Sequence, residues 1–243
     1  MTLHSKQGLA LPAAILISGA MISGSIIWSL HEISVAARGP VQQVSQAEVS
    51  RPAQIPSVDV ANVSTKGNPF VGSPTAMAVM AFWTDYQCPF CRQVETQVLP
   101  QLLTGYVNSG KLRIVFKDFQ FLGEDSVTAG LASRAVWEVA PERFYDCHKA
   151  MFDRQDGENT GWGNKADILA LTKTIPGIDA AKVEEFMSSH AARYQKEMDD
   201  DLAEGNSFGI NGTPGAVIGK QLIVGAQPYG AFKAAVDAAQ APK

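Results

Sequence analysis

The chain has 243 residues, of which 46% are hydrophobic and 18% are charged, and it carries a net charge of −4. A chain of this length and hydrophobic content is able to bury one sizeable core together with an insertion. The mildly acidic balance, with no cluster of Lys and Arg interleaved with aromatic residues, excludes a nucleic-acid-binding surface.

The N-terminal region predicts a membrane anchor. After a short segment, residues 1–8, the run Leu9–Leu30 contains no charged residue, and about 20 apolar residues suffice to span a bilayer as a helix. Lys6 lies on the short N-terminal side and gives a thin positive-inside bias. The alternative is a cleavable signal peptide with Ser34-Val35-Ala36 as its cleavage site, although the run exceeds the usual apolar core of about 7–15 residues.

Residues 31–66 predict a flexible linker. From Arg38 onwards this stretch is rich in Gln, Ser, Val and Pro, as in Arg51-Pro52-Ala53-Gln54-Ile55-Pro56, and it shows no sustained hydrophobic periodicity. Such a tether lets a folded domain, expected at residues 67–240, reach polypeptides near the outer face of the membrane.

The folded domain begins with a strand, a turn and a helix that carry a pair of cysteines. Met77–Trp83 is an uninterrupted apolar run typical of a buried strand, and Thr84–Gln87 forms the turn. Pro89 suits the first position of the following helix, which makes Cys88 its N-cap. Free N–H groups and the positive end of the helix dipole favour a thiolate there, and they lower a thiol pKa from about 8.5 to roughly 3.5–7.5.

The spacing Cys88-Pro89-Phe90-Cys91 admits three interpretations: a redox-active dithiol, a zinc site or a structural pair. Zinc usually requires a second pair of ligands. The other cysteine and histidines include no second CxxC and no HxxxH pattern; they are Cys147, His148, His190, His4 and His31. The redox dithiol is therefore the favoured interpretation.

Further along the chain, helices and strands alternate as in an α/β fold. The helix that contains Cys91 is expected to run past Leu99 despite Pro100, and Lys111–Asp118 alternates polar and apolar residues as a half-buried strand.

A block of helices is predicted between about residues 124 and 205, a segment too long for a loop. Its helical stretches are Val127–Val139, Pro141–Asp153, Lys165–Thr174, Ala180–His190 and Arg193–Glu204. Val217-Ile218 and Leu222-Ile223-Val224 then predict a hairpin, and Tyr229–Ala239 a closing helix.

Two segments together carry a family resemblance. Thr84-Asp85-Tyr86-Gln87-Cys88-Pro89-Phe90-Cys91 resembles the active-site segment of the DsbA-like branch of the thioredoxin superfamily, and Gly212-Thr213-Pro214 resembles its cis-proline loop. The resemblance extends from about Lys66 to Ala239. It implies a thioredoxin-like fold with a helical insertion at about 124–205, and a cis Thr213–Pro214 bond packed beside the two sulfurs.

The resemblance also implies a function. We expect a membrane-anchored, extracytoplasmic thiol:disulfide oxidoreductase that introduces disulfides into exported, cysteine-containing polypeptides. Its catalytic residues are Cys88 and Cys91, supported by Pro89 and Phe90, and the main chain of Thr213 pairs with an extended substrate segment. A quinone-linked membrane partner is expected to reoxidise the dithiol. No organic cofactor, metal ion or nucleic acid is expected.

Two rival functions stay open at this point. The same dithiol serves a disulfide reductase or isomerase if a partner keeps it reduced. Outside enzymes, the domain would be a membrane-tethered module that binds metal or unfolded polypeptides through the same groove. Secretion or a periplasmic location after signal cleavage is the alternative to membrane anchoring.

The sequence departs from the family pattern at two places. Many relatives have an acidic residue near the end of the first core strand, where this chain has Phe82, and the Pro89-Phe90 pair lacks the histidine of the strongest oxidants. Asp85 either takes over the proton transfer or serves as a turn-forming residue. Cys147 and His148 are interpreted as helix-packing residues, with a regulatory disulfide or a zinc site as the alternatives.

Overall fold

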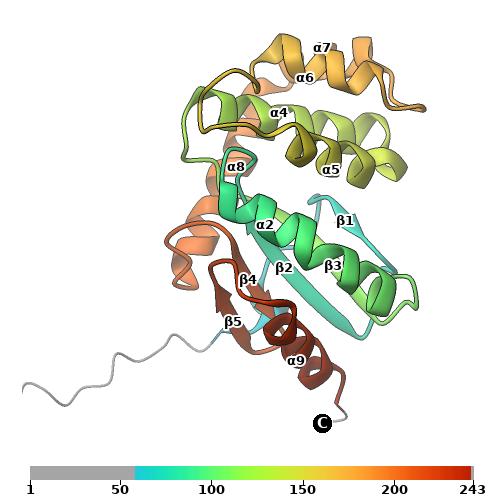
Figure 1. Cartoon of the computed structure of the whole chain (residues 1–243), viewed down its shortest axis with the longest axis vertical. Helices are drawn as coiled ribbons and strands as arrows, with labels where there is room; N and C mark the ends of the chain where they lie inside the picture. The colour runs from blue at the N-terminus through green and yellow to red at the C-terminus, as the bar shows by residue number, and fades with distance from the viewer. Residues whose placement is uncertain (1–57, 242–243) are drawn as a thin grey trace, which may run out of the picture. The chain divides into compact units, whose positions relative to one another are not determined.

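The computed structural model describes residues 58–241. Five strands form one mixed sheet in the order β1-β3-β2-β4-β5 (Figure 1). The strands are β1 (Phe70–Val71), β2 (Ala78–Thr84), β3 (Leu112–Asp118), β4 (Gly215–Ile218) and β5 (Gln221–Val224). The helices are α2 (Pro89–Gln97), α3 (Leu99–Leu102), α4 (Glu124–Val139), α5 (Phe144–Arg154), α6 (Lys165–Lys173), α7 (Ala180–Ser189), α8 (Ala191–Ser207) and α9 (Tyr229–Gln240). Short helical turns occur at η2 (Val60–Asn62), η3 (Leu103–Val107) and η4 (Pro141–Arg143).

Strand β2 lies at the centre of the sheet. It runs parallel to β3, with Phe82 opposite Phe116, and antiparallel to β4, with Phe82 opposite Ala216. The outer pairings, β1 with β3 and β4 with β5, are both antiparallel. A central strand covered on both faces explains why Ala78–Trp83 is apolar without alternation, whereas Met77, predicted as part of this strand, precedes it and is exposed.

Both faces of the sheet are covered by helices. Met80 and Phe82 lie in a core shared with residues of α2 and α9, whereas Ala81 and Trp83 lie in a core that includes Leu202 of α8. The predicted half-buried character of the next strand, β3, is therefore wrong: Lys117 and Asp118 are buried as well, because Lys117 pairs with Asp201 and Glu204 of α8 and Asp118 pairs with Arg134 of α4.

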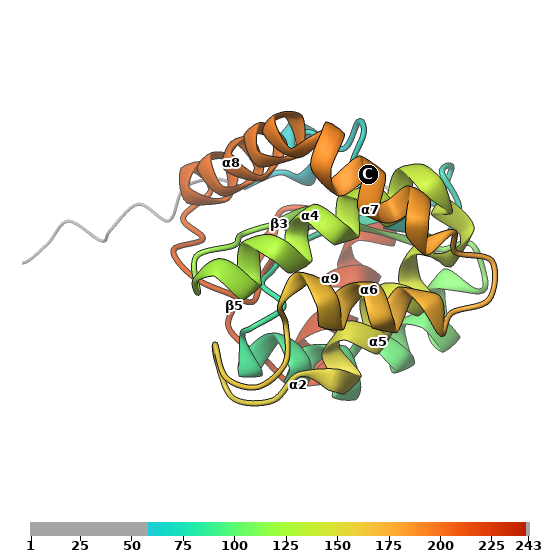
Figure 2. The same ribbon diagram turned by 90° about the horizontal axis from the view of Figure 1, so that it is seen from above.

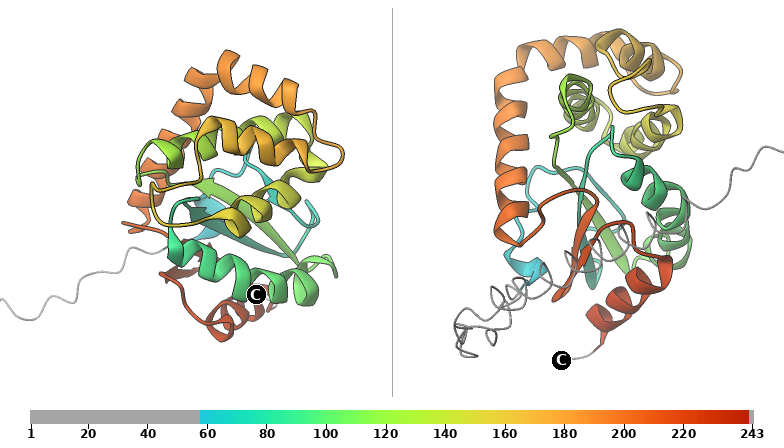
Figure 3. Two further views of the ribbon diagram at one scale, coloured as in Figure 1. Left: turned by 45° about the horizontal axis from the view of Figure 1, so that its top comes forward. Right: turned by 60° about the vertical axis from the view of Figure 1, so that its left-hand side comes forward.

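The predicted helical insertion is present as α4 to α8, with the η4 turn between α4 and α5. Seen from above in Figure 2, α4 to α7 lie together over the strands, and their apolar side chains form a separate core with the two active-site cysteines. Figure 3 shows α8 running from this block back along the sheet. The insertion thus contacts both the start of α2 and β3.

The helix that follows the cysteines is interrupted, although the chain stays helical as predicted. α2 ends at Gln97, Val98 keeps right-handed helical dihedral angles, and α3 begins at Leu99. Pro100 stands in the first turn of α3, where its missing N–H removes no internal hydrogen bond. The π-helical turn η3 then leads towards β3.

The predicted linker ends earlier than residue 66. Val58 and Val63 are buried against the sheet, the Val60 N–H donates to the Gly219 carbonyl oxygen at 2.7 Å, and the Ser64 N–H donates to Glu204 at 2.7 Å. Two apolar residues, Val58 and Val63, are too short a pattern to distinguish a packed segment from a flexible linker. Strand β1 was not predicted either, because two residues also show no recognisable pattern.

The predicted anchor, residues 9–30, and most of the predicted linker lie outside the described residues. Within residues 58–241, no helix combines the length and the apolar character needed to cross a membrane.

Candidate functional site

The two cysteines lie where β2 leads into α2. Cys88 is the N-cap of α2, with extended backbone angles (φ −79°, ψ 118°), and Pro89 stands in the first helical turn, both as predicted. Cys91 is fully buried, whereas Cys88 keeps an exposed fraction of 4%. Both residues are thiols in this structure. Cys88 is therefore the sulfur that an incoming reactant meets first.

The loop before β4 brings Thr213 and Pro214 to the dithiol. The Thr213–Pro214 bond is cis, as the resemblance implied. The Cys88 thiol donates to the main-chain carbonyl oxygen of Thr213, with the Cys88 Sγ and Thr213 O atoms 3.4 Å apart. Strand pairing explains the proximity, because Gly215 of β4 lies opposite Trp83 of β2. The sheet thus assembles the site from two segments that are distant in sequence.

The two sulfurs differ sharply in acidity. Hydrogen bonding, mainly from the Cys91 thiol, lowers the pKa of the Cys88 thiol to about 6. The backbone N–H groups of Cys91 and Phe90 act in the same direction, and partial burial opposes them. Burial raises the pKa of Cys91 well above its ordinary value, and the neighbouring Cys88 adds to the effect. Cys88 is therefore a thiolate at neutral pH, while Cys91 stays protonated.

This difference predicts a single acidic thiol titration. In the reduced protein, alkylation of Cys88 by a small electrophile is expected to rise with pH, to reach half its maximum near pH 6 and to level off above it, because only the thiolate reacts. The measurement is the alkylation rate as a function of pH, with Cys88→Ser as the control. A midpoint near the ordinary value of about 8.5 would contradict the assigned stabilisation.

Asp85 fastens the turn to the neighbouring loop. Its Oδ1 accepts a hydrogen bond from the Gln87 N–H at 2.9 Å, which is the geometry of a turn-forming aspartate. Its Oδ2 accepts from the N–H groups of Phe121 and Leu122 and from the Ser126 hydroxyl, the last at 2.6 Å. Burial raises the pKa of this carboxyl. The contacts of Asp85 support the turn-forming interpretation.

The comparison with known proteins decides the family. Residues 64–238 match the family model described as Thioredoxin, and this match covers most of the chain. The chain belongs to the thioredoxin family. The structure contains the sheet, the cysteine-bearing helix and the cis-proline loop on which the resemblance rested.

Among relatives, the chain is similar to Disulfide bond formation protein D of Bacillus subtilis, with 26% identity over 174 residues, which cover 72% of this chain and 78% of the relative. Its fold resembles oxidised BdbD from Bacillus subtilis, at a TM-score of 0.68 and 23% identity, covering 76% of this chain and 97% of that one. It also resembles the thiol-disulfide exchange protein alpha-DsbA2 from Wolbachia pipientis, at a TM-score of 0.62 and 26% identity, covering 70% and 86%. The protein is a DsbA-like thiol:disulfide oxidoreductase of the thioredoxin family.

A buried polar chain near the dithiol escaped the sequence analysis. Glu95 follows Cys91 by one turn of α2, and one of its carboxylate oxygens accepts from the Tyr145 hydroxyl at 2.7 Å. Its other oxygen lies 3.2 Å from Nε2 of His148. Nδ1 of His148 lies 2.7 Å from the hydroxyl of Tyr86, two residues before Cys88. His148 is thus a packing residue, as predicted, and also the centre of a hydrogen-bonded chain.

Helical spacing is the signal that would have identified Glu95. Cys91, Val94, Glu95 and Val98 all lie on the buried side of the helix, so a charged residue at that spacing indicates a buried partner. Phe82, which replaces the acidic residue of many relatives, packs against Phe116 with ring centroids 6.3 Å apart. In this chain α2 therefore contributes a buried carboxylate, Glu95, whereas the central strand carries the aromatic side chain of Phe82.

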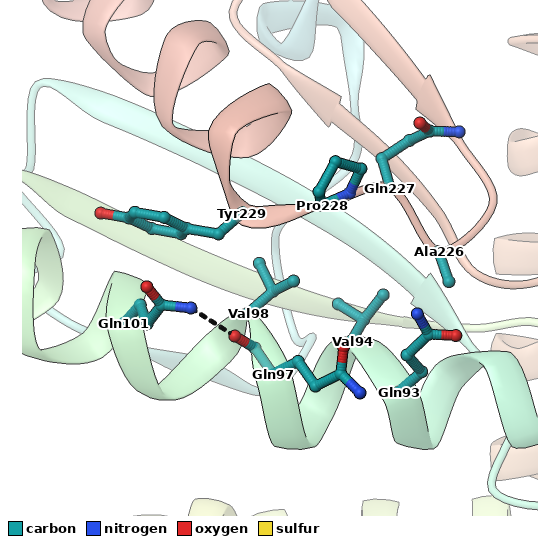
Figure 4. Close-up of a pocket in the computed structure, with 9 residues that line it drawn as sticks. All are labelled: Gln93, Val94, Gln97, Val98, Gln101, Ala226, Gln227, Pro228 and Tyr229. Atoms are coloured by element: carbon teal, nitrogen blue, oxygen red, sulfur yellow. Dashed lines mark hydrogen bonds between the residues drawn. The ribbon is translucent and has the colours of Figure 1, made fainter.

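A groove runs along one side of α2 and α3, between their exposed glutamines and the loop that carries Pro228 (Figure 4). Val94 and Val98 point from the helix towards the loop that carries Pro228, and amide side chains flank them. The groove encloses about 250 Å³ and is lined by Gln93, Val94, Gln97, Val98, Gln101, Ala226, Gln227, Pro228 and Tyr229. It begins one turn after the cysteine-bearing start of the helix, and it offers both apolar contacts and hydrogen-bonding amides.

Cys147 lies apart from this chemistry. It is buried in α5, within the core of the helical insertion, and burial raises the pKa of its thiol to about 12, with Asp146 adding to the effect. Such a thiol is inert at neutral pH. Within residues 58–241, His, Cys, Asp and Glu side chains form no group of three that could hold a metal ion.

Proposed function

We propose that the protein is a membrane-anchored, extracytoplasmic dithiol oxidase that introduces disulfides into exported polypeptides. The observation that carries the proposal is the acidity of Cys88, whose pKa of about 6 belongs to a sulfur that leaves readily as a thiolate. Stabilising the reduced form in this way makes the disulfide more oxidising than one whose cysteines have ordinary pKa values.

The reaction needs only the two sulfurs. A substrate thiolate attacks Sγ of Cys88 in the oxidised protein, which breaks the Cys88–Cys91 bond and forms a mixed disulfide. Cys91 leaves with the electron pair and takes up a proton, in line with its raised pKa. A second substrate thiolate then attacks the substrate sulfur of the mixed disulfide and releases Cys88 as a thiolate. The substrate is oxidised by two electrons, and the dithiol keeps them.

Three features around Cys88 suit a polypeptide substrate. The cis-proline loop places the Thr213 main chain beside the sulfur, where an extended segment is able to pair with it. Phe90 and Phe121 are large apolar side chains that stay more than half exposed, and the stretch Gln93–Gln101, in α2 and α3, lines the groove of Figure 4. Main-chain pairing and apolar contact favour unfolded chains over folded ones.

The reduction potential separates this proposal from a reductase or isomerase. We expect the purified protein to be more oxidising in its equilibrium with glutathione than thioredoxin, which lies at about −270 mV, and to oxidise a reduced two-cysteine peptide stoichiometrically. A potential near that of a reductant, together with poor peptide oxidation, would assign the reducing direction. Tight equimolar metal binding without any thiol exchange would instead select the binding-module alternative.

Anchoring belongs to the same proposal. The uncharged run Leu9–Leu30 would hold the catalytic domain outside the cytoplasm, where a disulfide persists, and where a membrane partner would reoxidise the dithiol. We expect the protein to remain with membranes after carbonate extraction, with its domain cleaved by protease added to spheroplasts. A soluble product that begins near Ala37 would show instead that the segment is a cleaved signal peptide.

A further inference from the structure

One side chain of the helical insertion holds two backbone carbonyl groups of the turn that leads into α2. Gln155, the residue that directly follows α5, is 5% exposed. Its Nε2 donates to the carbonyl oxygen of Tyr86 at 2.6 Å and to that of Cys88 at 3.1 Å. The contact is reciprocated, because Nη1 of Arg92 in α2 donates to the main-chain oxygen of Gln155 at 2.9 Å.

The position of these contacts matters for the nucleophile. The two carbonyl groups are two residues apart, so a single NH₂ group that holds both restricts the backbone rotations between Tyr86 and Cys88. Those rotations decide whether Cys88 keeps the extended angles of an N-cap and directs its sulfur at the first N–H groups of α2. The neighbouring loop contacts the same turn, because the Asn159 N–H donates to Gln87 Oε1 at 3.0 Å.

We propose that Gln155 is a positioning residue that holds the Cys88 backbone in the N-cap geometry on which its thiolate depends. The helical insertion therefore sets the redox poise of the thioredoxin-like core, besides covering it. This inference rests on the proposed thiol chemistry, and it adds which residue outside the thioredoxin-like core helps to set the reduction potential of the cysteine pair. It differs from a purely structural role, in which Gln155 only holds the end of α5 against the domain.

The test uses the full-length reduced protein with Gln155→Met, which keeps the side-chain length but removes both donors. We expect the Cys88 pKa to rise by about one unit, a tenfold loss of thiolate stabilisation. At pH 7 the equilibrium with glutathione should shift towards the disulfide by about fivefold, which corresponds to about 20 mV for a two-electron couple. The readouts are the thiolate absorbance as a function of pH and the equilibrium constant with glutathione.

Two further variants separate positioning from stability. Gln155→Asn keeps the amide but shortens the side chain, so it should not reach both carbonyls and should raise the Cys88 pKa as well. Val183→Ala removes buried volume from α7 in the same insertion, and it should lower Tm while leaving the thiol titration unchanged.

An unchanged Cys88 titration in both Gln155 variants, with a reduced Tm, would overturn the inference and leave Gln155 a structural residue. A similar pKa rise in Val183→Ala would overturn it too, because loosening of the insertion anywhere would then suffice. Failure of the proposed function has a separate signature: the wild-type protein would titrate near pH 6 yet would not exchange disulfides with peptides.

Discussion

Replacing Cys88 with serine is expected to reduce disulfide exchange to the uncatalysed background, whereas replacing Cys91 with serine is expected to trap substrate. The reason is position: Cys88 is the sulfur that a reactant meets and the one whose thiolate is stabilised, while Cys91 is fully buried. In Cys91→Ser, a mixed disulfide on Cys88 has no internal thiol to resolve it. Reduced protein incubated with a disulfide-bonded peptide and analysed on non-reducing gels measures the trapped adduct.

The third cysteine supplies the matched control. Cys147→Ser removes a buried thiol from α5, so exchange should continue at the parental rate and no adduct should accumulate. Equal trapping by Cys88→Ser and Cys91→Ser would contradict the assigned roles. Loss of exchange in Cys147→Ser without loss of structure would show that the pair at the start of α2 is not the whole redox centre.

The features predicted correctly from sequence are those encoded locally. The two cysteines, the turn before them and the proline in the first helical turn occupy a few consecutive residues, Thr84–Cys91, and each element has its own residue pattern. Strand β2 was predicted from its uninterrupted apolar run, and the insertion helices were long enough to be recognised. Strand β1, with two residues, and the 58–66 segment carry no such pattern, and only their contacts with the rest of the domain hold them in place.

The contacts that adjust the site could not be predicted in the same way. Gln155 meets Cys88 across 67 positions of sequence, and Glu95 meets His148 across 53. A glutamine after a helix and a histidine within one are ordinary residues until the fold brings them to the dithiol. Asp85 had two interpretations because the motif shows only its position before Cys88. The N–H groups that it accepts from, those of Phe121 and Leu122, belong to a loop that is distant in sequence.

A buried cluster of charges on the opposite face of the sheet could not be predicted from the sequence either, because its members are distant from one another along the chain. Lys117 of β3 is 1% exposed and pairs with Asp201 and Glu204 of α8, the latter at 2.9 Å. Its Nζ also donates to the carbonyl oxygen of Ser64 at 2.8 Å. Arg134 of α4 contacts Asp201 as well, at 2.8 Å. The cluster ties the insertion, the sheet and the N-terminal segment together.

Asp201 makes this cluster sensitive to pH. Burial raises the pKa of its carboxyl to about 6, against the lowering effect of Lys117, and Asp118 adds to the rise. A carboxyl whose pKa is higher in the folded than in the unfolded protein binds more protons when folded. Its ionisation therefore costs stability as pH rises from about 4 to about 6, and the cations beside it limit that cost.

Removing the buried cation should consequently be among the most destabilising single changes in the domain. We expect Lys117→Met to lower the free energy of unfolding at neutral pH by about 3–5 kcal/mol, because carboxylates are left buried without their partner. Without Lys117 the pKa of Asp201 should rise further, so the deficit should shrink as pH falls towards 5. Urea unfolding at several pH values measures both effects.

Two companion variants make this expectation specific to the buried charges. Lys149→Met disrupts an exposed pair with Asp153 on α5 and should cost only about 0.5 kcal/mol or less. Combining Lys117→Met with Asp201→Asn removes a charge of each sign, and it should restore part of the loss as a coupling between neighbours. A deficit that is independent of pH and is not relieved by Asp201→Asn would show that Lys117 acts through packing against Trp83, whose ring centroid lies 6.0 Å from Nζ, and not through its charge.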